Sequence, residues 1–225
     1  MQFFARLPDD KLVMTKAPEE GYVWEWRAFG TLDQTLVEKI TAHPVRIDVN
    51  GVSLSNLSGQ DLYLISPASD HNIKLRKAFG GDWILKFKLL LRTEAHAIEW
   101  YHESSKKSFR FPVGRAVLEE AAGLLRVRLP EPSAEATELK ADAFVEMLQH
   151  SAPQVRKILI GKIRSQYQIG DAWVELADVT FPTRRTQSIS LHAFDRATVE
   201  GLLGEYRPED GLEVMNYVDA CRRWA

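Results

Sequence analysis

The chain has 225 residues, 45% of them hydrophobic, with a formal net charge of −2 and a pI of about 6.3. These values describe an ordinary globular chain and exclude a general nucleic-acid coat or a membrane-surface binder, both of which need a positive charge balance. One cysteine, Cys221, excludes an intrachain disulfide, and without a signal-peptide pattern or an apolar run of about 18 residues we expect a cytoplasmic protein.

Residues 1–21 carry mixed charge and two prolines, and we interpret them as an N-terminal extension that precedes a single domain at 22–225. A first strand is predicted at 22–29, where aromatic and β-branched residues are dense. Because side chains alternate along a strand, Glu25 and Arg27 share one of its faces. The next predicted elements are a helix and two short strands, at 32–43, 45–49 and 62–65.

The most informative stretch is a predicted hairpin with one cationic and one apolar face. Lys74 and Arg76 share a face of its first strand, Lys86 and Lys88 share a face of its second, and a Gly-Gly-Asp turn joins the two. A single pair of this kind is typical of the solvated face of a half-buried sheet. The pattern returns, however, at Lys162 and Arg164. If several such faces pointed inward in a closed barrel, the lumen would be positively charged, and a bound polyanion would neutralise the cations.

The rest of the chain alternates between strands and helices. Strands are predicted at 97–102, 109–111, 125–129, 154–168, 172–180 and 186–193, and helices at 113–125, 135–149, 195–206 and 212–224. Strands joined by tight turns, with helices in the connections, indicate an α+β fold built on an antiparallel barrel. The strand tryptophans alternate with charge, and we expect an outer shell beneath the helices from Trp24, Trp26, Trp83, Trp100 and Trp173.

The order of these features resembles the CYTH superfamily, the triphosphate tunnel metalloenzymes that include class IV adenylate cyclases, thiamine triphosphatases and inorganic triphosphatases. The resemblance spans about residues 22–224. The matching positions are Glu25 with Arg27, Asp61 with Tyr63, Lys74 with Arg76, Lys86 with Lys88, Glu99, Lys162 with Arg164, Glu175 with Asp178, and Asn216 with Tyr217. It implies a closed, eight-stranded antiparallel barrel with helices packed outside it.

The resemblance also implies two sets of functional residues. Lys and Arg side chains in the tunnel would bind a triphosphate group: Lys74, Arg76, Lys86, Lys88, Arg110, Lys162 and Arg164. Acidic side chains would hold Mg²⁺ or Mn²⁺: Glu25, Glu99, Glu175 and Asp178. No catalytic residue is assigned.

The sequence departs from the family pattern mainly where the metal would be bound. Val23 stands at the first position of the opening Glu-x-Glu-x-Lys motif, and Arg27 at its Lys. The strand at 97–101 keeps one acid, Glu99, and the late Glu-x-Glu strand corresponds to 187–192, which has none. The anion-binding half is therefore retained while the metal-binding half is reduced, which favours anion binding over turnover.

The leading hypothesis is a CYTH-like protein that binds a triphosphate- or polyphosphate-bearing ligand in a basic tunnel, with phosphohydrolase activity weak or lost. One alternative is an Mg²⁺- or Mn²⁺-dependent triphosphatase or adenylate cyclase-like enzyme. Another is a non-catalytic scaffold that contacts a protein partner through its outer surface or residues 1–21. The expected ligand is a phosphorylated small molecule such as a nucleotide, or polyphosphate, and neither membrane binding nor general nucleic-acid binding is expected.

Overall fold

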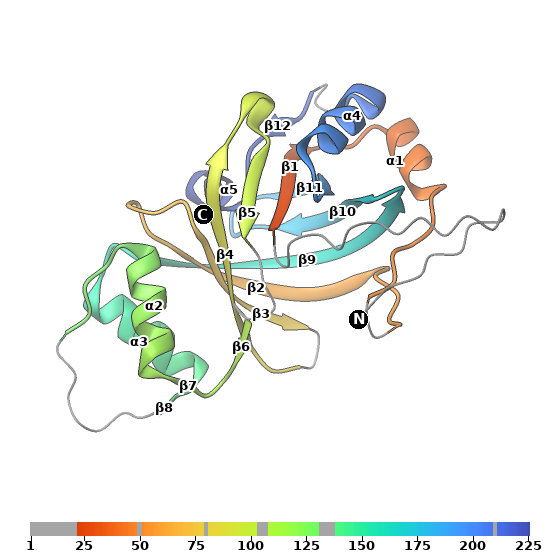
Figure 1. The fold of residues 1–225 in the computed structure, drawn as a ribbon. Coiled ribbons are helices and arrows are strands. Elements are labelled where there is room, and N and C mark those ends of the chain that lie inside the picture. Colours follow the sequence, from red (N-terminus) through yellow and green to blue (C-terminus); the bar gives the residue numbers. More distant parts are fainter. Residues whose placement is uncertain (1–21, 49–50, 79–80, 103–107, 131–137, 209–210) are drawn as a thin grey trace.

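The structure is a computed structural model that describes residues 22–48, 51–78, 81–102, 108–130, 138–208 and 211–225. The proposed N-terminal extension lies outside these ranges. Within them, eight strands form a closed antiparallel barrel (Figure 1). They are β1 (Tyr22–Gly30), β2 (Leu57–Ile65), β3 (Asn72–Ala78), β4 (Ile84–Thr93), β5 (Glu99–His102), β9 (Arg156–Ile169), β10 (Ala172–Thr180) and β11 (Arg185–Ala193).

The barrel closes because β1 pairs with β5 on one side and with β11 on the other. The order around the wall is β1, β11, β10, β9, β2, β3, β4, β5, so strands far apart in the sequence become neighbours. The expected fold class is confirmed. The described residues form four short strands outside this ring: β6 (Ser108–Arg110), β7 (Val113–Gly114), β8 (Glu138–Leu139) and β12 (Glu213–Val214).

Helices lie outside the barrel or at its end, and each is found in a connection between strands or at the C-terminus (Figure 1). They are α1 (Gln34–Thr41), the short 3₁₀ helix η1 (Ala95–Ala97), α2 (Arg115–Leu125), α3 (Ala141–Ser151), α4 (Arg196–Tyr206) and α5 (Tyr217–Trp224). No helix in the part of the chain that the structure describes is both long and apolar enough to span a membrane.

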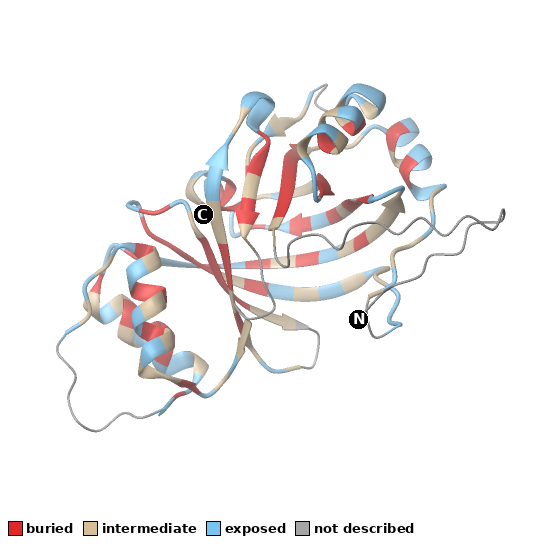
Figure 2. Cartoon of the chain, in the orientation of Figure 1, coloured by how far each residue is buried: buried red, intermediate tan, exposed pale blue. Residues whose placement is uncertain are grey.

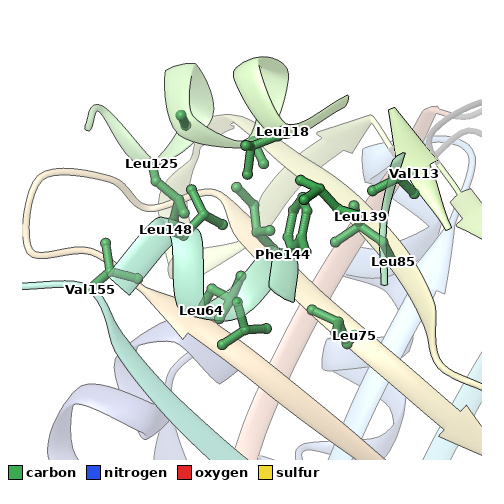
Figure 3. Close-up of a cluster of buried hydrophobic side chains, with 14 of the residues drawn as sticks. Leu64, Leu75, Leu85, Val113, Leu118, Leu125, Leu139, Phe144, Leu148 and Val155 are labelled. Carbon is green, nitrogen blue, oxygen red and sulfur yellow. The ribbon is translucent and has the colours of Figure 1, made fainter. Parts of the chain in front are cut away.

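The helices α2 and α3 cover the apolar face of the β3–β4 hairpin (Figure 3). Leu75 and Leu85, which project from the two strands, are buried in one cluster with Leu118 of α2 and Phe144 of α3. Since alternate side chains point to opposite faces, burial of these leucines turns the lysines and arginine between them into the barrel. The apolar packing on the outside therefore sets the orientation of the charges on the inside.

Two further apolar clusters are formed by the residues that the structure describes. Trp26 of β1 is buried beneath α1 and α4, on the face opposite Glu25 and Arg27. At one end of the barrel, α5 packs on inward-facing apolar residues such as Phe29 and Ile160. Figure 2 shows the resulting bands of buried and accessible residues along the long strands β2 and β9. Inside the barrel, the apolar packing against α5 gives way along β9 to charged side chains, beginning with Lys162.

Several predicted boundaries need correction. The segment 125–129 is not a strand: Leu125 ends α2, Arg126 adopts a left-handed conformation with φ 55°, and the Val127 amide donates to the Ala122 carbonyl at 2.9 Å. A helix C-terminus of this type folds the chain back on itself, and the following apolar residue packs on the helix. That local geometry overrides the β-like alternation of the sequence.

The other differences are similar in kind. The predicted strand at 45–49 forms only single bridges, from Val45 and Ile47, and Val49 lies outside the described residues. The helix predicted at 135–149 is α3 at Ala141–Ser151, with 135–137 likewise undescribed. The helix predicted from residue 212 begins at Tyr217, because Asn216 caps it. In α4 the expected cap is confirmed, with the Thr198 amide donating to Asp195 at 2.8 Å.

Candidate functional site

A cavity of about 370 Å³ occupies the barrel interior, and it brings together the three cationic pairs found in the sequence. Among the residues that the structure describes, eight cations and two carboxylates line it. The cations are Arg27, Arg46, Lys74, Arg76, Lys86, Lys88, Lys162 and Arg164, and the carboxylates are Glu25 and Glu175. Positive charge is therefore gathered in the lumen of a chain whose net charge is −2.

Strand register explains why these cations meet. Lys74 lies directly opposite Lys86 in the β3–β4 pair, and β2 connects β3 to β9, which carries Lys162 and Arg164. Like charges at directly opposed positions destabilise a sheet. Buried carboxylates and a bound anion are the two means of offsetting that repulsion, and the structure shows the first.

Asp61 of β2 is the carboxylate beneath the Lys/Arg pairs. Its exposed fraction is 2%, and it accepts from Arg76 in a bidentate arrangement, with Nε at 2.8 Å and Nη2 at 2.9 Å. Lys162 Nζ donates to the same carboxylate at 2.8 Å, and Lys74 Nζ lies 3.6 Å away. Burial would raise the pKa of Asp61, but Lys162, Arg76 and Lys74 hold it well below its usual range. Asp61 is therefore an ionised counterion that positions three cations.

Tyr63 and Tyr217 form an aromatic floor under the same lysines. Lys162 Nζ lies 3.4 Å from the ring centroid of Tyr217 and donates to the Tyr63 hydroxyl at 2.9 Å. Lys74 Nζ donates to that hydroxyl at 3.3 Å. Cation–π contacts and hydrogen bonds to a neutral phenol stabilise an ammonium without neutralising it. These contacts therefore fix the positions of the two ammonium groups in the cavity wall.

A second network joins Glu25 to Glu175 through Arg27. Arg27 Nε donates to Oε1 of Glu25 at 3.0 Å, and Arg27 Nη2 donates to Oε1 of Glu175 at 3.4 Å. Lys88 donates to the other oxygen of Glu25, while Arg164 and Gln166 donate to the other oxygen of Glu175 at 2.8 Å and 2.9 Å. Burial would raise the pKa of each glutamate, but the neighbouring cations lower it below the ordinary value.

Glu99 of β5 has different surroundings. It accepts from Asn216 Nδ2 at 2.7 Å and from the Tyr101 hydroxyl, and it is buried behind those two residues, which line the cavity. Burial raises the pKa of Glu99 despite the hydrogen bonds from Tyr101 and Asn216, which act in the opposite direction. Glu99 thus lies opposite Glu25 in the β1–β5 pair but takes its hydrogen bonds from neutral donors and not from the cations of the Glu25–Glu175 network.

The inward face of β11 carries hydroxyl and imidazole groups in place of acids. Ser188, Ser190 and His192 project from the strand that corresponds to the family's late Glu-x-Glu motif. His192 lies in the cavity wall with Nε2 at 2.8 Å from Ser190 Oγ, and burial lowers its pKa to about 4. The imidazole is therefore neutral near pH 7.

Trp173 corrects one expectation about the tryptophans. It lines the cavity and does not belong to the outer shell. Its ring stacks on His192 with centroids 5.1 Å apart, and the Arg46 guanidinium lies 4.2 Å from its centroid. Alternation predicts this, because Trp173 and Glu175 are two residues apart on β10 and share a face. Arg46 has no such signal in the sequence, since it lies in an irregular segment that bonds to Gln166 at the end of β9.

Besides Glu99, two predicted site residues are not among the described residues that line the cavity. Asp178 is three residues from Glu175 and so projects from the opposite face of β10, where it is exposed and accepts from Gln187 Nε2 at 3.4 Å. Arg110 is exposed on β6, and Ser108 is the residue of that strand that reaches the cavity wall. The roles of the remaining predicted residues as phosphate and metal ligands stay predictions.

The surroundings of the carboxylates determine whether they fit Mg²⁺ or Mn²⁺. In the described residues, no group of three or more His, Cys, Asp or Glu side chains is arranged to hold a metal ion. Every carboxylate oxygen of Glu25, Glu175 and Glu99 already accepts from a side-chain donor. Mg²⁺ requires oxygen lone pairs in near-octahedral geometry. The glutamates in this arrangement therefore do not fit a metal centre.

No protein-family model and no curated protein matches this sequence. Among solved structures, the PH1012 protein of Pyrococcus horikoshii OT3 matches with a TM-score of 0.51 and 11% identity, over 87% of this chain and 98% of that one. A putative adenylyl cyclase from Hippeastrum, described as having a dominant triphosphatase activity, matches with a TM-score of 0.48 and 11% identity, over 89% and 95% of the two chains. A putative adenylate cyclase from Bacillus halodurans matches with a TM-score of 0.48 and 9% identity, over 89% of this chain and 98% of that one.

At these identities the likeness concerns the fold alone. The eight-stranded closed barrel described above is the architecture that the sequence resemblance implied. The chain therefore shares the fold of the PH1012 protein, a closed antiparallel barrel with helices outside it.

Proposed function

We propose that this protein binds a triphosphate- or polyphosphate-bearing ligand in its cationic tunnel, and that its phosphohydrolase activity is weak or lost. The observation that carries the proposal is the convergence of eight Lys and Arg side chains, among the described residues, on one cavity of about 370 Å³. Ligand pockets in proteins commonly have volumes of about 300–1,000 Å³. Charge-assisted hydrogen bonds from Lys and Arg are the strong contacts that phosphate oxygens accept.

The proposal of weak or lost phosphohydrolase activity rests on the side chains that lie near the cations in the lumen. Phosphoryl transfer is catalysed by positioning and by charge stabilisation, to which bound metal ions contribute by neutralising the developing charge. Here β11 contributes Ser188, Ser190 and His192 to the inward face, and the two glutamates in the cavity wall are paired with cations. Tight binding of the ground state lowers KM without accelerating the chemical step. The site is therefore suited to holding an anion.

Thermal unfolding of the purified protein with tripolyphosphate, ATP and long-chain polyphosphate, each with and without Mg²⁺ or Mn²⁺, tests the proposal. A ligand that binds only the folded state raises the Tm in proportion to the logarithm of its concentration. We expect stabilisation by these anions and little or no release of inorganic phosphate. Rapid metal-dependent phosphate release would identify a triphosphatase, and no stabilisation by any of the anions would favour an interaction scaffold.

A further inference from the structure

The Arg27 guanidinium lies between the two glutamates of the cavity wall, and each of its three nitrogens donates a hydrogen bond. Nε and Nη2 contact Glu25 and Glu175 at 3.0 Å and 3.4 Å, and Nη1 donates to Ser188 Oγ at 3.4 Å. The guanidinium carbon lies 4.4 Å from the ring centroid of Tyr217. The side chain is 6% exposed. Arg27 is therefore a fixed part of the wall.

The remaining oxygens of the two glutamates are also engaged by donors of the chain. Lys88 contacts Oε2 of Glu25, and His192 Nδ1 lies 3.5 Å from that atom. Arg164 and Gln166 donate to Oε2 of Glu175. A divalent cation that approached either carboxylate would have to displace a donor and would meet the positive charges of Arg27, Lys88 and Arg164.

We propose that Arg27 occupies the position between Glu25 and Glu175 that a divalent cation would need, so that the tunnel binds its triphosphate anion without Mg²⁺ or Mn²⁺. Guanidinium is suited to this position because it stays protonated and presents donors in a fixed planar fork that can join two carboxylates. It offers no lone pair to a metal and contributes one positive charge permanently. This inference rests on the proposed function and specifies the form of its ligand, which is the metal-free polyanion.

The proposal predicts how metal ions affect binding. Mg²⁺ in solution neutralises part of the charge of tripolyphosphate, so the free anion is the better match for the cationic wall. Calorimetric titration with tripolyphosphate should show binding in EDTA, with no gain in affinity when EDTA is replaced by excess Mg²⁺. Binding that appears only with metal, or that becomes tenfold tighter with it, would overturn the inference and leave the proposed function standing. No binding in either buffer would instead remove the proposed function.

A second measurement tests Arg27 itself and needs no phosphate ligand. Free Mn²⁺ is quantified by electron paramagnetic resonance in solutions of wild-type protein and of Arg27→Met, in which two carboxylates lose the cation between them. We expect the wild-type protein to leave Mn²⁺ free at millimolar concentration and Arg27→Met to bind it at least tenfold more tightly. Arg164→Ala is the matched control, because it removes a cation from Glu175 but leaves Arg27 between the two glutamates.

The outcomes separate clearly. Stoichiometric Mn²⁺ binding by the wild-type protein, or equal Mn²⁺ affinities of folded Arg27→Met and Arg164→Ala, would contradict the role given to Arg27. If circular dichroism shows that Arg27→Met does not fold, Arg27→Lys replaces it in the calorimetric titration. That variant keeps the charge, so its tripolyphosphate binding in EDTA should again gain nothing from Mg²⁺, and a tenfold gain would count against the inference.

Discussion

At the scale of single residues, the cavity wall places like charges opposite one another, as Lys74 and Lys86 show in the β3–β4 pair. An anion between such side chains gains several charge-assisted hydrogen bonds and relieves their repulsion. The contribution of one lysine is therefore measurable.

Replacing Lys86 by Ala should weaken tripolyphosphate binding by about ten- to a hundredfold. A hydrogen bond to a charged group contributes about 1.5–3 kcal/mol, and about 1.4 kcal/mol corresponds to one decade in Kd. Calorimetry at low salt measures the change. Lys157→Ala is the control, because Lys157 is exposed and lies on the opposite face of β9 from Lys162. Equal affinities of the two variants would show that the tunnel is not the binding site.

His192 should make stability depend on pH. Its pKa is lowered to about 4, mainly by burial, against about 6.5 in an unfolded chain. Between these pH values the unfolded state binds the proton and the native state does not. The contribution of neutral His192 to the free energy of unfolding is therefore fully present above pH 6.5 and is lost as pH falls towards 4. The free energy of unfolding should decline over that interval, by up to about 3 kcal/mol.

Urea denaturation at several pH values from 4 to 7 measures this slope. His192→Gln should flatten the part of the slope that lies between pH 6.5 and 4, whatever its effect on stability at pH 7. Asp61, Glu25 and Glu175, whose pKa values are lowered, give contributions with the same sign at lower pH, where they are lost as pH falls through their folded pKa values. An unchanged slope in His192→Gln would mean that His192 is not the titrating group.

At the scale of the elements, α5 is connected to the cavity wall through its N-cap. The Asn216 side chain accepts from the Asp219 amide at 2.9 Å and donates to Oε1 of Glu99 at 2.7 Å. Asn216 thus has two roles. It caps the helix that packs at the end of the barrel, and it donates a hydrogen bond to the buried carboxyl group of Glu99.

Asn216→Ala should lower the free energy of unfolding by more than the loss of an ordinary N-cap does. Loss of an N-cap costs about 0.5–2 kcal/mol, and leaving a buried acceptor without its donor costs about 1–3 kcal/mol more. Asp195→Ala is the matched control, since it removes the N-cap of α4 and an exposed hydrogen bond from the Thr198 hydroxyl but no contact with a buried carboxyl group. Chemical denaturation of both variants checks the difference. Equal losses of stability would indicate that the contact with Glu99 contributes little.

At the scale of the whole molecule, the net charge of −2 and the cationic lumen imply that negative charge predominates elsewhere on the chain. A partly enclosed cavity lined by one sign of charge focuses the field at its mouth and attracts anions. The interaction at long range is screened by salt, whereas contacts within the cavity are screened much less.

Tripolyphosphate affinity should therefore fall as sodium chloride is raised from about 50 mM to 500 mM, because the Debye length decreases from more than 10 Å towards 3 Å. Titrations at four salt concentrations give the slope of log Kd against log salt. Lys86→Ala should reduce that slope because it removes one charge from the wall. A wild-type affinity that does not change with salt would contradict an electrostatic mode of binding.

Local periodicity in the sequence determined much of this protein. Alternation of apolar and charged residues predicted that Lys74 with Arg76, and Lys86 with Lys88, share a face, because the two-residue period is a property of any strand. Capping chemistry likewise predicted the start of α4 at Asp195. The order of such features was sufficient for the α+β barrel, since each local preference agrees with the global fold.

Tertiary structure alone decided the chemistry of the lumen. Closure brings Arg27 to Glu175 and Lys162 to Asp61, pairs separated by 148 and 101 residues, and no local pattern specifies such partners. It also placed Arg46 beside Trp173 and left Arg110 outside the cavity. The physical reason is that a carboxylate's role depends on the donors packed around it. The family resemblance implied metal ligands at Glu25, Glu99 and Glu175, whereas in the folded chain their oxygens accept from side chains of the chain itself.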